Sequence, residues 1–237
     1  PTPKFPSNEG GAAVRAIQIF VTGGPEVLTE VDLPTPVAAA GEIRVRAEVI
    51  GIGRPDLLVR KGIYKWMPPL PAIPGSELIG VVDSLGAGVP TELAGRRVLV
   101  SARELAVRGG CYAEYICVPA SAVYVLPDTL DPVDAASLPN LQLVNALWQS
   151  HGERPVDFIL MTGVSGGVGA MLIPFARMKG AQVIGTTATP QKAQNLRAQG
   201  VFSVVCGEVT TWPEQIMQAT KAQGVGLAID QLGGDAL

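Results

Sequence analysis

The chain has 237 residues, a length typical of two domains, and 47% of its residues are apolar while 16% are charged. This apolar content suffices for a buried core and excludes a disordered chain. Because 18 basic and 21 acidic residues leave a net charge of −3 and form no long basic run, nothing indicates a nucleic-acid partner.

The sequence shows no signal for membrane insertion or secretion. No run approaches the roughly eighteen consecutive apolar residues of a membrane-spanning helix. Residues 1–13 lack the apolar centre of a signal peptide, and we expect them to form a flexible leader. The cysteines Cys111, Cys117 and Cys206 show no C-x-x-C spacing. We therefore predict a cytoplasmic protein with no membrane partner.

From residue 14 to residue 130 the chain is typical of a β-rich domain. Its clearest strand is EIRVRAEVI, residues 42–50, in which apolar residues such as Ile43 and Val45 alternate with polar ones such as Arg44. Gly and Pro turn signals separate the candidate strands. Further strands are predicted at residues 15–21, 78–85, 96–102, 111–118 and 122–127. The pattern indicates a compact, barrel-like domain.

From residue 131 to residue 237 strands and helices alternate. Apolar strands are predicted at residues 156–163, 181–187, 202–207 and 225–231, and helices at 167–180, 191–199 and 213–223. Strand-helix-strand alternation favours a parallel sheet covered by helices. Thr189 is expected to cap the second helix, and Thr211 with Glu214 to form a capping box at the third.

A glycine-rich stretch, MTGVSGGVGAML, lies between the first strand and the first helix of this alternation. In that context glycines allow a tight turn, a close approach to a pyrophosphate and close packing of the helix on the strand. The helix N-terminus then holds the anion. A P-loop is excluded because no Lys-Ser or Lys-Thr follows the glycines. The predicted nucleotide-binding residues are Gly163, Ser165, Gly166, Gly167, Val168 and Gly169.

The end of the second strand of this domain indicates which cofactor is preferred. NAD-binding proteins place an acid there for the ribose 2′-hydroxyl, but Thr186 and Thr187 occupy the strand end here and no acid follows. Lys192 lies in the first turn of the next helix, where a cation opposes the helix dipole unless a 2′-phosphate is near. We predict NADPH, held in part by these three residues; the alternative is that Lys192 is a solvated surface lysine.

With these motifs in this order, the chain resembles the medium-chain dehydrogenase/reductase superfamily, and within it the zinc-independent quinone oxidoreductase and enoyl reductase branch. The resemblance is carried by residues 60–82, 109–120, 123–139, 161–172 and 183–200. It implies a two-domain α/β fold. A GroES-like β-barrel substrate domain (14–130) would precede a Rossmann NADPH-binding domain (131–237) that lacks the last part found in the family.

The residues that hold zinc in related branches are replaced. Gly53 stands where zinc enzymes of the superfamily place a cysteine, and Ser76 stands where they place a histidine. The chain's one histidine, His151, lies elsewhere, and we expect it to be exposed. Three scattered cysteines cannot build a structural zinc site. We predict a protein without a metal ion.

The chemistry that the resemblance implies is hydride transfer from NADPH to a quinone or to an electron-poor C=C bond. Tyr64 matches a tyrosine that serves as proton donor or electrophile in similar enoyl reductases. A phenol keeps its proton at neutral pH and can donate it to an enolate. Tyr64 is therefore the predicted catalytic residue, with the alternative that it only lines the pocket.

Three residues are predicted to line the acceptor pocket. Gly53 stands where many quinone reductases have an asparagine, so a polar contact is missing there. Trp66 suggests a broad apolar pocket, although packing in the core would explain it equally well. Val144 replaces a threonine that the family has near the nicotinamide, and Asn145 is the candidate to supply the lost polarity.

Family members continue beyond AIDQLGGDAL with further strands of the nucleotide-binding sheet. A sheet of four strands would leave an unpaired apolar edge. A shortened sequence, a natural short form and dimerisation that covers the edge are all compatible with this; we favour the first and also expect a homodimer.

Two functions remain open. The first is an NADPH-dependent reductase of quinones or activated alkenes, and the second is an NADPH-binding protein without turnover, such as a redox sensor or a crystallin-like structural protein. The acceptor cannot be named from the sequence. Enoyl thioesters would require a basic groove, for which Arg54, Arg60, Lys61 and Lys65 are candidates; a solvated face explains these four equally well.

Overall fold

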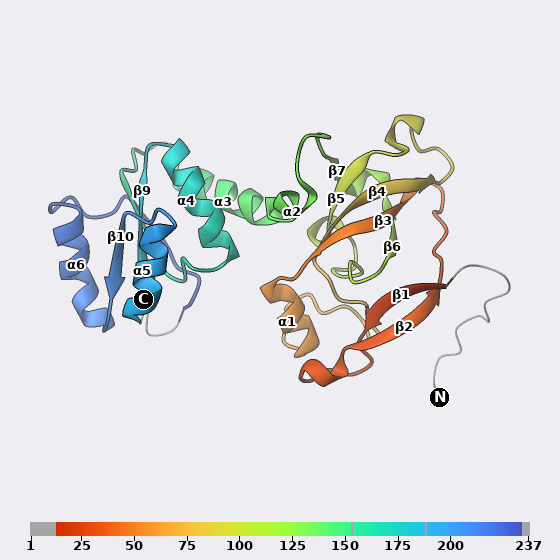
Figure 1. The fold of residues 1–237 in the computed structure, drawn as a ribbon, viewed down its shortest axis with the longest axis horizontal. Coiled ribbons are helices and arrows are strands. Elements are labelled where there is room, and N and C mark those ends of the chain that lie inside the picture. Colours follow the sequence, from red (N-terminus) through yellow and green to blue (C-terminus); the bar gives the residue numbers. More distant parts are fainter. Residues whose placement is uncertain (1–12, 153, 188, 234–237) are drawn as a thin grey trace. The chain divides into compact units, whose positions relative to one another are not determined.

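A computed structural model describes residues 13–152, 154–187 and 189–233 of the chain (Figure 1). The chain forms two compact units, Pro1–Ala136 and Ser137–Leu237. The division lies just beyond the expected boundary between residues 130 and 131, because the short helix α2 (Pro132–Ala135) belongs to the first unit. Of the predicted leader, residues 1–12 lie outside the described residues.

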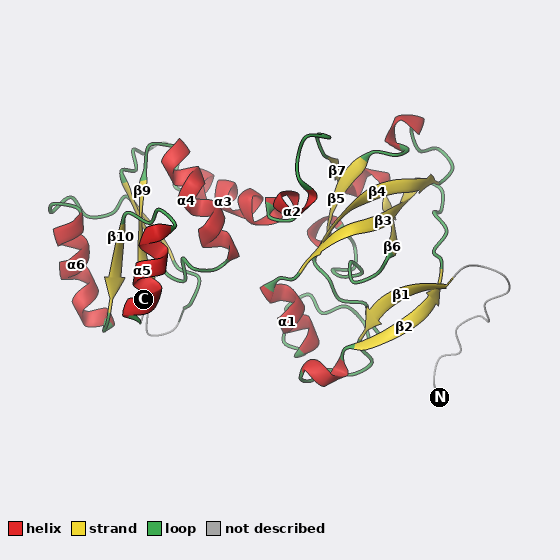
Figure 2. Cartoon of the chain, in the orientation of Figure 1, coloured by secondary structure: helices red, strands yellow, loops and turns green. Residues whose placement is uncertain are grey.

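The first unit is built on an antiparallel sheet of five strands in the order β6-β3-β4-β5-β7 (Figure 2). The alternation read in β3 has its expected cause: Ile43 and Val45 are fully buried, whereas Arg44 pairs with Asp83 on the neighbouring strand. The five strands are β3 (Glu42–Gly51), β4 (Glu77–Leu85), β5 (Arg97–Ser101), β6 (Tyr115–Pro119) and β7 (Val123–Val125).

A hairpin and a short helix complete this unit. Strand β1 (Ala13–Gln18) pairs antiparallel with β2 (Thr29–Pro34), and helix α1 (Arg54–Arg60) follows β3. Neither β2 nor α1 was predicted: β2 alternates charged with apolar residues but is short and largely exposed, and α1 has only seven residues. The strand predicted from residue 111 begins only at Tyr115. Single turns of 3-10 helix lie at Pro25–Val27, Thr91–Leu93, Ala102–Glu104 and Ala120–Ala122.

The second unit is a parallel sheet of four strands in the order β10-β9-β8-β11. Helices connect successive strands, as expected for a Rossmann-type unit. Its elements are α3 (Leu138–Ser150), β8 (Phe158–Met161), α4 (Gly167–Met178), β9 (Gln182–Thr187), α5 (Pro190–Ala198), β10 (Ser203–Cys206), a 3-10 turn (Val209–Thr211), α6 (Trp212–Ala219) and β11 (Leu227–Ile229). The core joins both layers, with Ile159 and Met161 of β8 packed with Leu172 and Ala176 of α4.

The helix ends differ from the predicted caps. The Thr189 side chain makes no capping hydrogen bond, and the Thr211 hydroxyl donates instead to the carbonyl of Glu208. Both threonines still occupy the residue before the helix. Among the described residues, no helix has the length and apolar character needed to cross a bilayer.

Candidate active site

The glycine-rich turn after β8 is shaped by contacts that exclude larger residues. Gly163 has a φ of +65°, a conformation that favours glycine. A Cβ atom on Gly169 would lie 1.9 Å from the carbonyl oxygen of Val164, and one on Gly185 in β9 would lie 2.5 Å from Val164 Cγ1. Helix α4 therefore reaches the sheet closely only because these positions have no side chain.

The N-terminus of α4 presents backbone donors without a side-chain cap. Gly166 precedes the helix and makes no side-chain cap hydrogen bond, so the first-turn N–H groups at Gly167, Val168 and Gly169 have no partner within the helix. A Cβ atom on Gly167 would lie 2.9 Å from Asn140 Nδ2. Free N–H groups beside bare glycine backbone are the donor set that a pyrophosphate needs. These residues therefore fit a dinucleotide.

The carboxyl edge of the sheet brings β8 and β11 together at the same place. The Thr162 hydroxyl donates to Asp230 Oδ1 and accepts the Gln231 N–H at 3.0 Å. Asp230 also accepts the Gly233 N–H at 2.8 Å. The hydrogen bond from Thr162, followed by those from the backbone, lowers the pKa of Asp230. Strand order reverses between β8 and β11, which is where open parallel sheets bind ligands.

The three residues predicted to select the cofactor differ in accessibility. Thr186 is only 5% exposed within β9, so little of its side chain is accessible to a ligand. Thr187 ends the strand and is partly exposed, and its Oγ1 accepts the Thr189 N–H at 3.4 Å. Lys192 is exposed in the first turn of α5. Thr187 and Lys192 are therefore available to a ligand, whereas Thr186 holds the strand in the core.

Tyr64 and Trp66 follow α1 in the first unit. Tyr64 is half-buried against Ile19, Val59 and Ala72. Its ring meets Trp66 edge to face with 5.7 Å between centroids, while Trp66 is 50% exposed. Trp66 is thus a surface residue. The alternative that it packs in the core is wrong.

A buried carboxylate organises the other end of α1. Asp56 is 5% exposed, and its Oδ1 accepts the Ser76 hydroxyl at 2.6 Å. Its Oδ2 accepts the Gly53 N–H at 2.8 Å and the Tyr112 hydroxyl at 3.2 Å. Gly53 and Ser76, the two positions where the resemblance places zinc ligands in other branches, are therefore joined here through Asp56.

The surroundings of Asp56 suppress ionisation of neighbouring groups. Burial, followed by the charge of Asp56, raises the pKa values of Glu77 and of the Tyr112 phenol. Burial also raises the pKa of the Cys111 thiol to about 12. Tyr112 therefore remains a hydrogen-bond donor throughout the physiological range.

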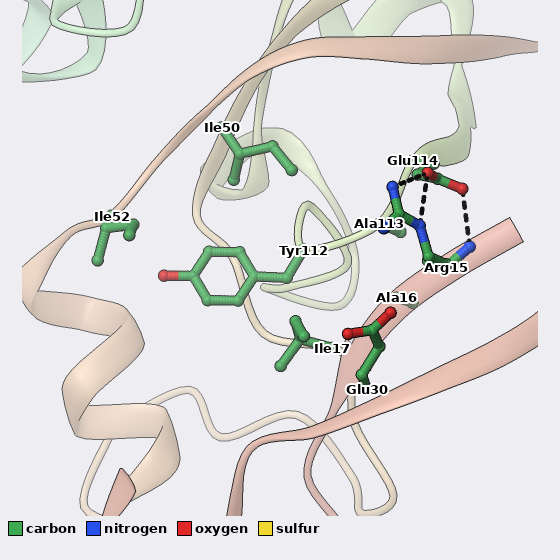
Figure 3. Close-up of a pocket in the computed structure, with 9 residues that line it drawn as sticks. All are labelled: Arg15, Ala16, Ile17, Glu30, Ile50, Ile52, Tyr112, Ala113 and Glu114. Atoms are coloured by element: carbon green, nitrogen blue, oxygen red, sulfur yellow. Dashed lines mark hydrogen bonds and ion pairs between the residues drawn. The ribbon is translucent and has the colours of Figure 1, made fainter.

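Tyr112 also borders an open, mainly apolar cavity of about 360 Å³ (Figure 3). The ring lies near Ile17 and Ile50, and the hydroxyl points toward Ile52, away from the ion pair of Arg15 with Glu114. Ile52 directly precedes Gly53. An apolar ligand in this cavity would thus lie beside the Tyr112 phenol and contact Ile52, the residue before Gly53.

The remaining predicted residues are placed as follows. Val144 is fully buried in the core of the second unit, and Asn145 is exposed on α3. His151 is not exposed as expected: it is half-buried against Trp148, and neither ring nitrogen has a hydrogen-bond partner. Within the described ranges, no group of three or more His, Cys, Asp or Glu side chains could hold a metal ion.

Sequence reasoning missed Asp56, Tyr112 and Asp230. The signal for Asp56 was its position three residues after Gly53, where a carboxylate can accept the N–H that begins a helix. Tyr112 lies in the GGCYAEY stretch that supported the resemblance, yet no chemistry was assigned to it. Asp230 follows an apolar strand, so the strand-end rule used for Thr187 would have found it.

Comparison with known proteins places this geometry in a family. Residues 39–128 match the model of the alcohol dehydrogenase GroES-like domain. Quinone oxidoreductase from Rattus norvegicus is 31% identical over 231 residues, which are 96% of this chain and 69% of the relative. The chain belongs to the quinone oxidoreductase branch of the medium-chain dehydrogenases/reductases. Its GroES-like first unit and Rossmann-type second unit confirm the predicted fold class.

Two further similar proteins carry information on the cofactor and the reaction in their names. A 2-haloacrylate reductase from a Burkholderia species is 32% identical over 235 residues, covering 94% of this chain and 68% of that protein. A mycobacterial protein solved in complex with NADPH has a TM-score of 0.81 and 32% identity, covering 93% of this chain and 67% of that one. Of these two similar proteins, one thus binds NADPH in its solved structure and the other is named a 2-haloacrylate reductase.

Proposed function

We propose that this oxidoreductase uses NADPH to reduce a quinone or an activated C=C bond without a metal ion. The observation that carries the proposal is the uncapped N-terminus of α4, whose glycines leave backbone donors free for a pyrophosphate. Thr187 and the exposed Lys192, with no acid at the end of β9, support the phosphorylated cofactor. When bound, NADPH supplies the hydride.

On the acceptor side, the residues must stabilise negative charge that develops on the acceptor oxygen. We propose that the Tyr64 hydroxyl donates a hydrogen bond, and then its proton, to that oxygen or to the adjacent carbanion. Solvent returns a proton to the phenolate afterwards. The Gly53 turn, fixed by Asp56, and the exposed face of Trp66 would bound the acceptor. The expected contact from Asn145 stays a prediction.

The metal-free part of the proposal is supported by the residues that replace ligands. Gly53 has no side chain, and the Ser76 hydroxyl donates a hydrogen bond to Asp56. Cys111 is fully buried with a raised thiol pKa, which disfavours the thiolate that zinc requires. Dialysis against a strong chelator is therefore expected to leave activity unchanged.

The direct test is NADPH oxidation against a panel of quinones, enones and enoyl thioesters. We expect oxidation that depends on at least one acceptor, with NADPH preferred to NADH. Tight binding of NADPH without acceptor-dependent oxidation would favour the second candidate, a binding protein without turnover. Two observations favour that candidate: Gly53 offers no polar side chain, and the position expected to be polar near the nicotinamide is the buried Val144.

Tyr64→Phe tests the catalytic assignment. The variant keeps the ring that packs on Trp66 and removes only the hydroxyl. We expect kcat to fall by roughly 100-fold, with NADPH binding unchanged. Full turnover on every accepted substrate would show that Tyr64 only lines the pocket. The proposed homodimer and cytoplasmic location require separate measurements, by light scattering and by cell fractionation.

A further inference from the structure

A second cavity, of about 250 Å³, lies beside Trp66. Six of its seven lining residues are apolar in type, and Arg108 is the only ionisable residue among them. The lining residues are Trp66, Met67, Pro68, Pro69, Ala106, Val107 and Arg108. The cavity thus combines an indole, an apolar floor and a single guanidinium.

The cations at Trp66 are held in place by its ring. The guanidinium carbon of Arg108 lies 4.1 Å from the ring centroid, and the Lys65 ammonium lies 5.1 Å from it. Contact with the face of an indole orients a guanidinium while leaving its N–H groups at the edge free to donate. Arg108 is therefore prearranged for a planar anion.

Within the described residues, no ion pair joins either cation to an acidic side chain. The ion pairs in the described part of the chain join Arg15 to Glu114, Arg44 to Asp83 and Arg97 to Glu48, and none includes Arg108 or Lys65. No ion pair of the described residues therefore compensates the two positive charges at Trp66, which favours an anionic ligand.

We propose that this cavity binds the carboxylate of an acceptor that carries one, with Arg108 as its main contact and Lys65 as a supporting charge. The proposal rests on the proposed function and narrows its substrate class. Tyr64 links the cavity to the proposed reaction, because its ring contacts the ring of Trp66 edge to face. An acceptor whose carboxylate lies at Arg108 would be anchored beside the proposed proton donor. Arg108 and Lys65 would thus act in substrate selection.

Binding can be tested without any reaction. The probes are 3-benzoylpropionate and its methyl ester, which have no C=C bond to reduce and differ in one charge. Calorimetry or ligand-observed NMR on the 237-residue chain, without cofactor, measures both affinities. We expect the carboxylate to bind about tenfold more tightly than the ester. Equal affinity of the two probes would overturn the proposal.

Three variants show which positive charge causes the preference for the carboxylate over its ester. Arg108→Gln should abolish the preference for the carboxylate, and Arg108→Lys should retain part of it because the charge stays while the planar fork is lost. Lys179→Gln is the matched control, since Lys179 also lies over a ring, that of Phe175, but at the C-cap of α4 in the second unit. Preference retained in Arg108→Gln, or lost equally in Lys179→Gln, would contradict the assignment. Thermal melts confirm that each variant is folded.

The reactive pair 3-benzoylacrylate and its methyl ester separates this inference from the proposed function. If the chain reduces both compounds with equal KM, the proposed function stands and the carboxylate site fails. If it reduces neither of them nor any acceptor of the panel, and still binds the saturated carboxylate through Arg108, the site stands and the proposed function fails. The combined account expects a KM about tenfold lower for the carboxylate, and loss of that difference in Arg108→Gln.

Discussion

The Ser76 hydroxyl donates a 2.6 Å hydrogen bond to Asp56, linking the start of β4 to the first turn of α1. The same carboxylate accepts the Gly53 N–H and the Tyr112 hydroxyl. One buried side chain thereby fixes three segments that are far apart in the sequence. At the two positions where the resemblance places zinc ligands in other branches, Gly53 and Ser76, this hydrogen-bonded cluster organises the backbone.

Asp56→Ala should lower the free energy of unfolding by about 3 kcal/mol, because it leaves two hydroxyls and one N–H group without their acceptor. Ser76→Ala should cost only about 1 kcal/mol, since it removes one donor. Urea denaturation measures both. Asp128→Ala, at an exposed position, serves as control and should change stability by less than about 0.5 kcal/mol. Equal effects of the three substitutions would contradict a central role for Asp56.

Glu77 gives a test by pH. Burial and the charge of Asp56 raise its pKa above the ordinary value of 4.5, so in the pH range between the two values the unfolded state loses the proton while the folded state keeps it. Because of Glu77, the free energy of unfolding therefore decreases as pH rises from 4.5 through the pKa that Glu77 has in the folded state. Glu77→Gln should be increasingly stabilised relative to the wild type over that window.

Denaturation at a series of pH values checks this prediction. Glu92→Gln, an exposed glutamate in the 3-10 turn Thr91–Leu93, is the matched control. A difference between Glu77→Gln and the wild type that does not vary with pH would show that Glu77 has the same pKa in both states.

Two glycines in the same turn should respond differently to alanine. In Gly169→Ala the new Cβ would meet the Val164 carbonyl at 1.9 Å, so the variant should lose about 3 kcal/mol of stability or fail to fold. In Gly167→Ala the Cβ would meet Asn140 Nδ2 at 2.9 Å, and that amide can rotate away. Gly167→Ala should therefore fold and lose affinity for NADPH. Thermal melts and fluorescence titration distinguish the two effects; normal NADPH affinity in Gly167→Ala would argue against a pyrophosphate at this turn.

Lys192→Glu tests the choice of cofactor. Replacing the cation by an anion should raise the Kd of NADPH by roughly tenfold or more and leave that of NADH nearly unchanged. Lys179→Glu, at the C-cap of α4, controls for the general change in charge. If the ratio of the two Kd values stays the same in Lys192→Glu, a residue other than Lys192 selects the cofactor.

Sequence patterns predicted well what depends on short-range periodicity. The alternation around Ile43 marked β3, and the apolar runs marked all four strands of the second unit, because burial on a sheet imposes a period on the sequence. The glycine turn was also found, since its spacing follows from a local requirement for space.

What the sequence could not supply depends on distant contacts. Ser76 and Tyr112 meet Asp56 only after the β domain has folded, so no local pattern pairs them. Arg108 reaches Trp66 from a loop more than forty residues away in the chain. The predicted caps at Thr189 and Thr211 failed for a related reason: a suitable residue type occupied each place, but the side chains adopted other contacts or none.

The central claim is tested most directly with NADPH that carries deuterium in place of the C4 hydrogen that is transferred. With a simple enone as acceptor, the account predicts NADPH oxidation that requires the acceptor, a reduced product with one deuterium on carbon, and no loss of rate after dialysis against a chelator. Oxidation without label in the product, or no oxidation with any acceptor despite tight NADPH binding, would contradict it.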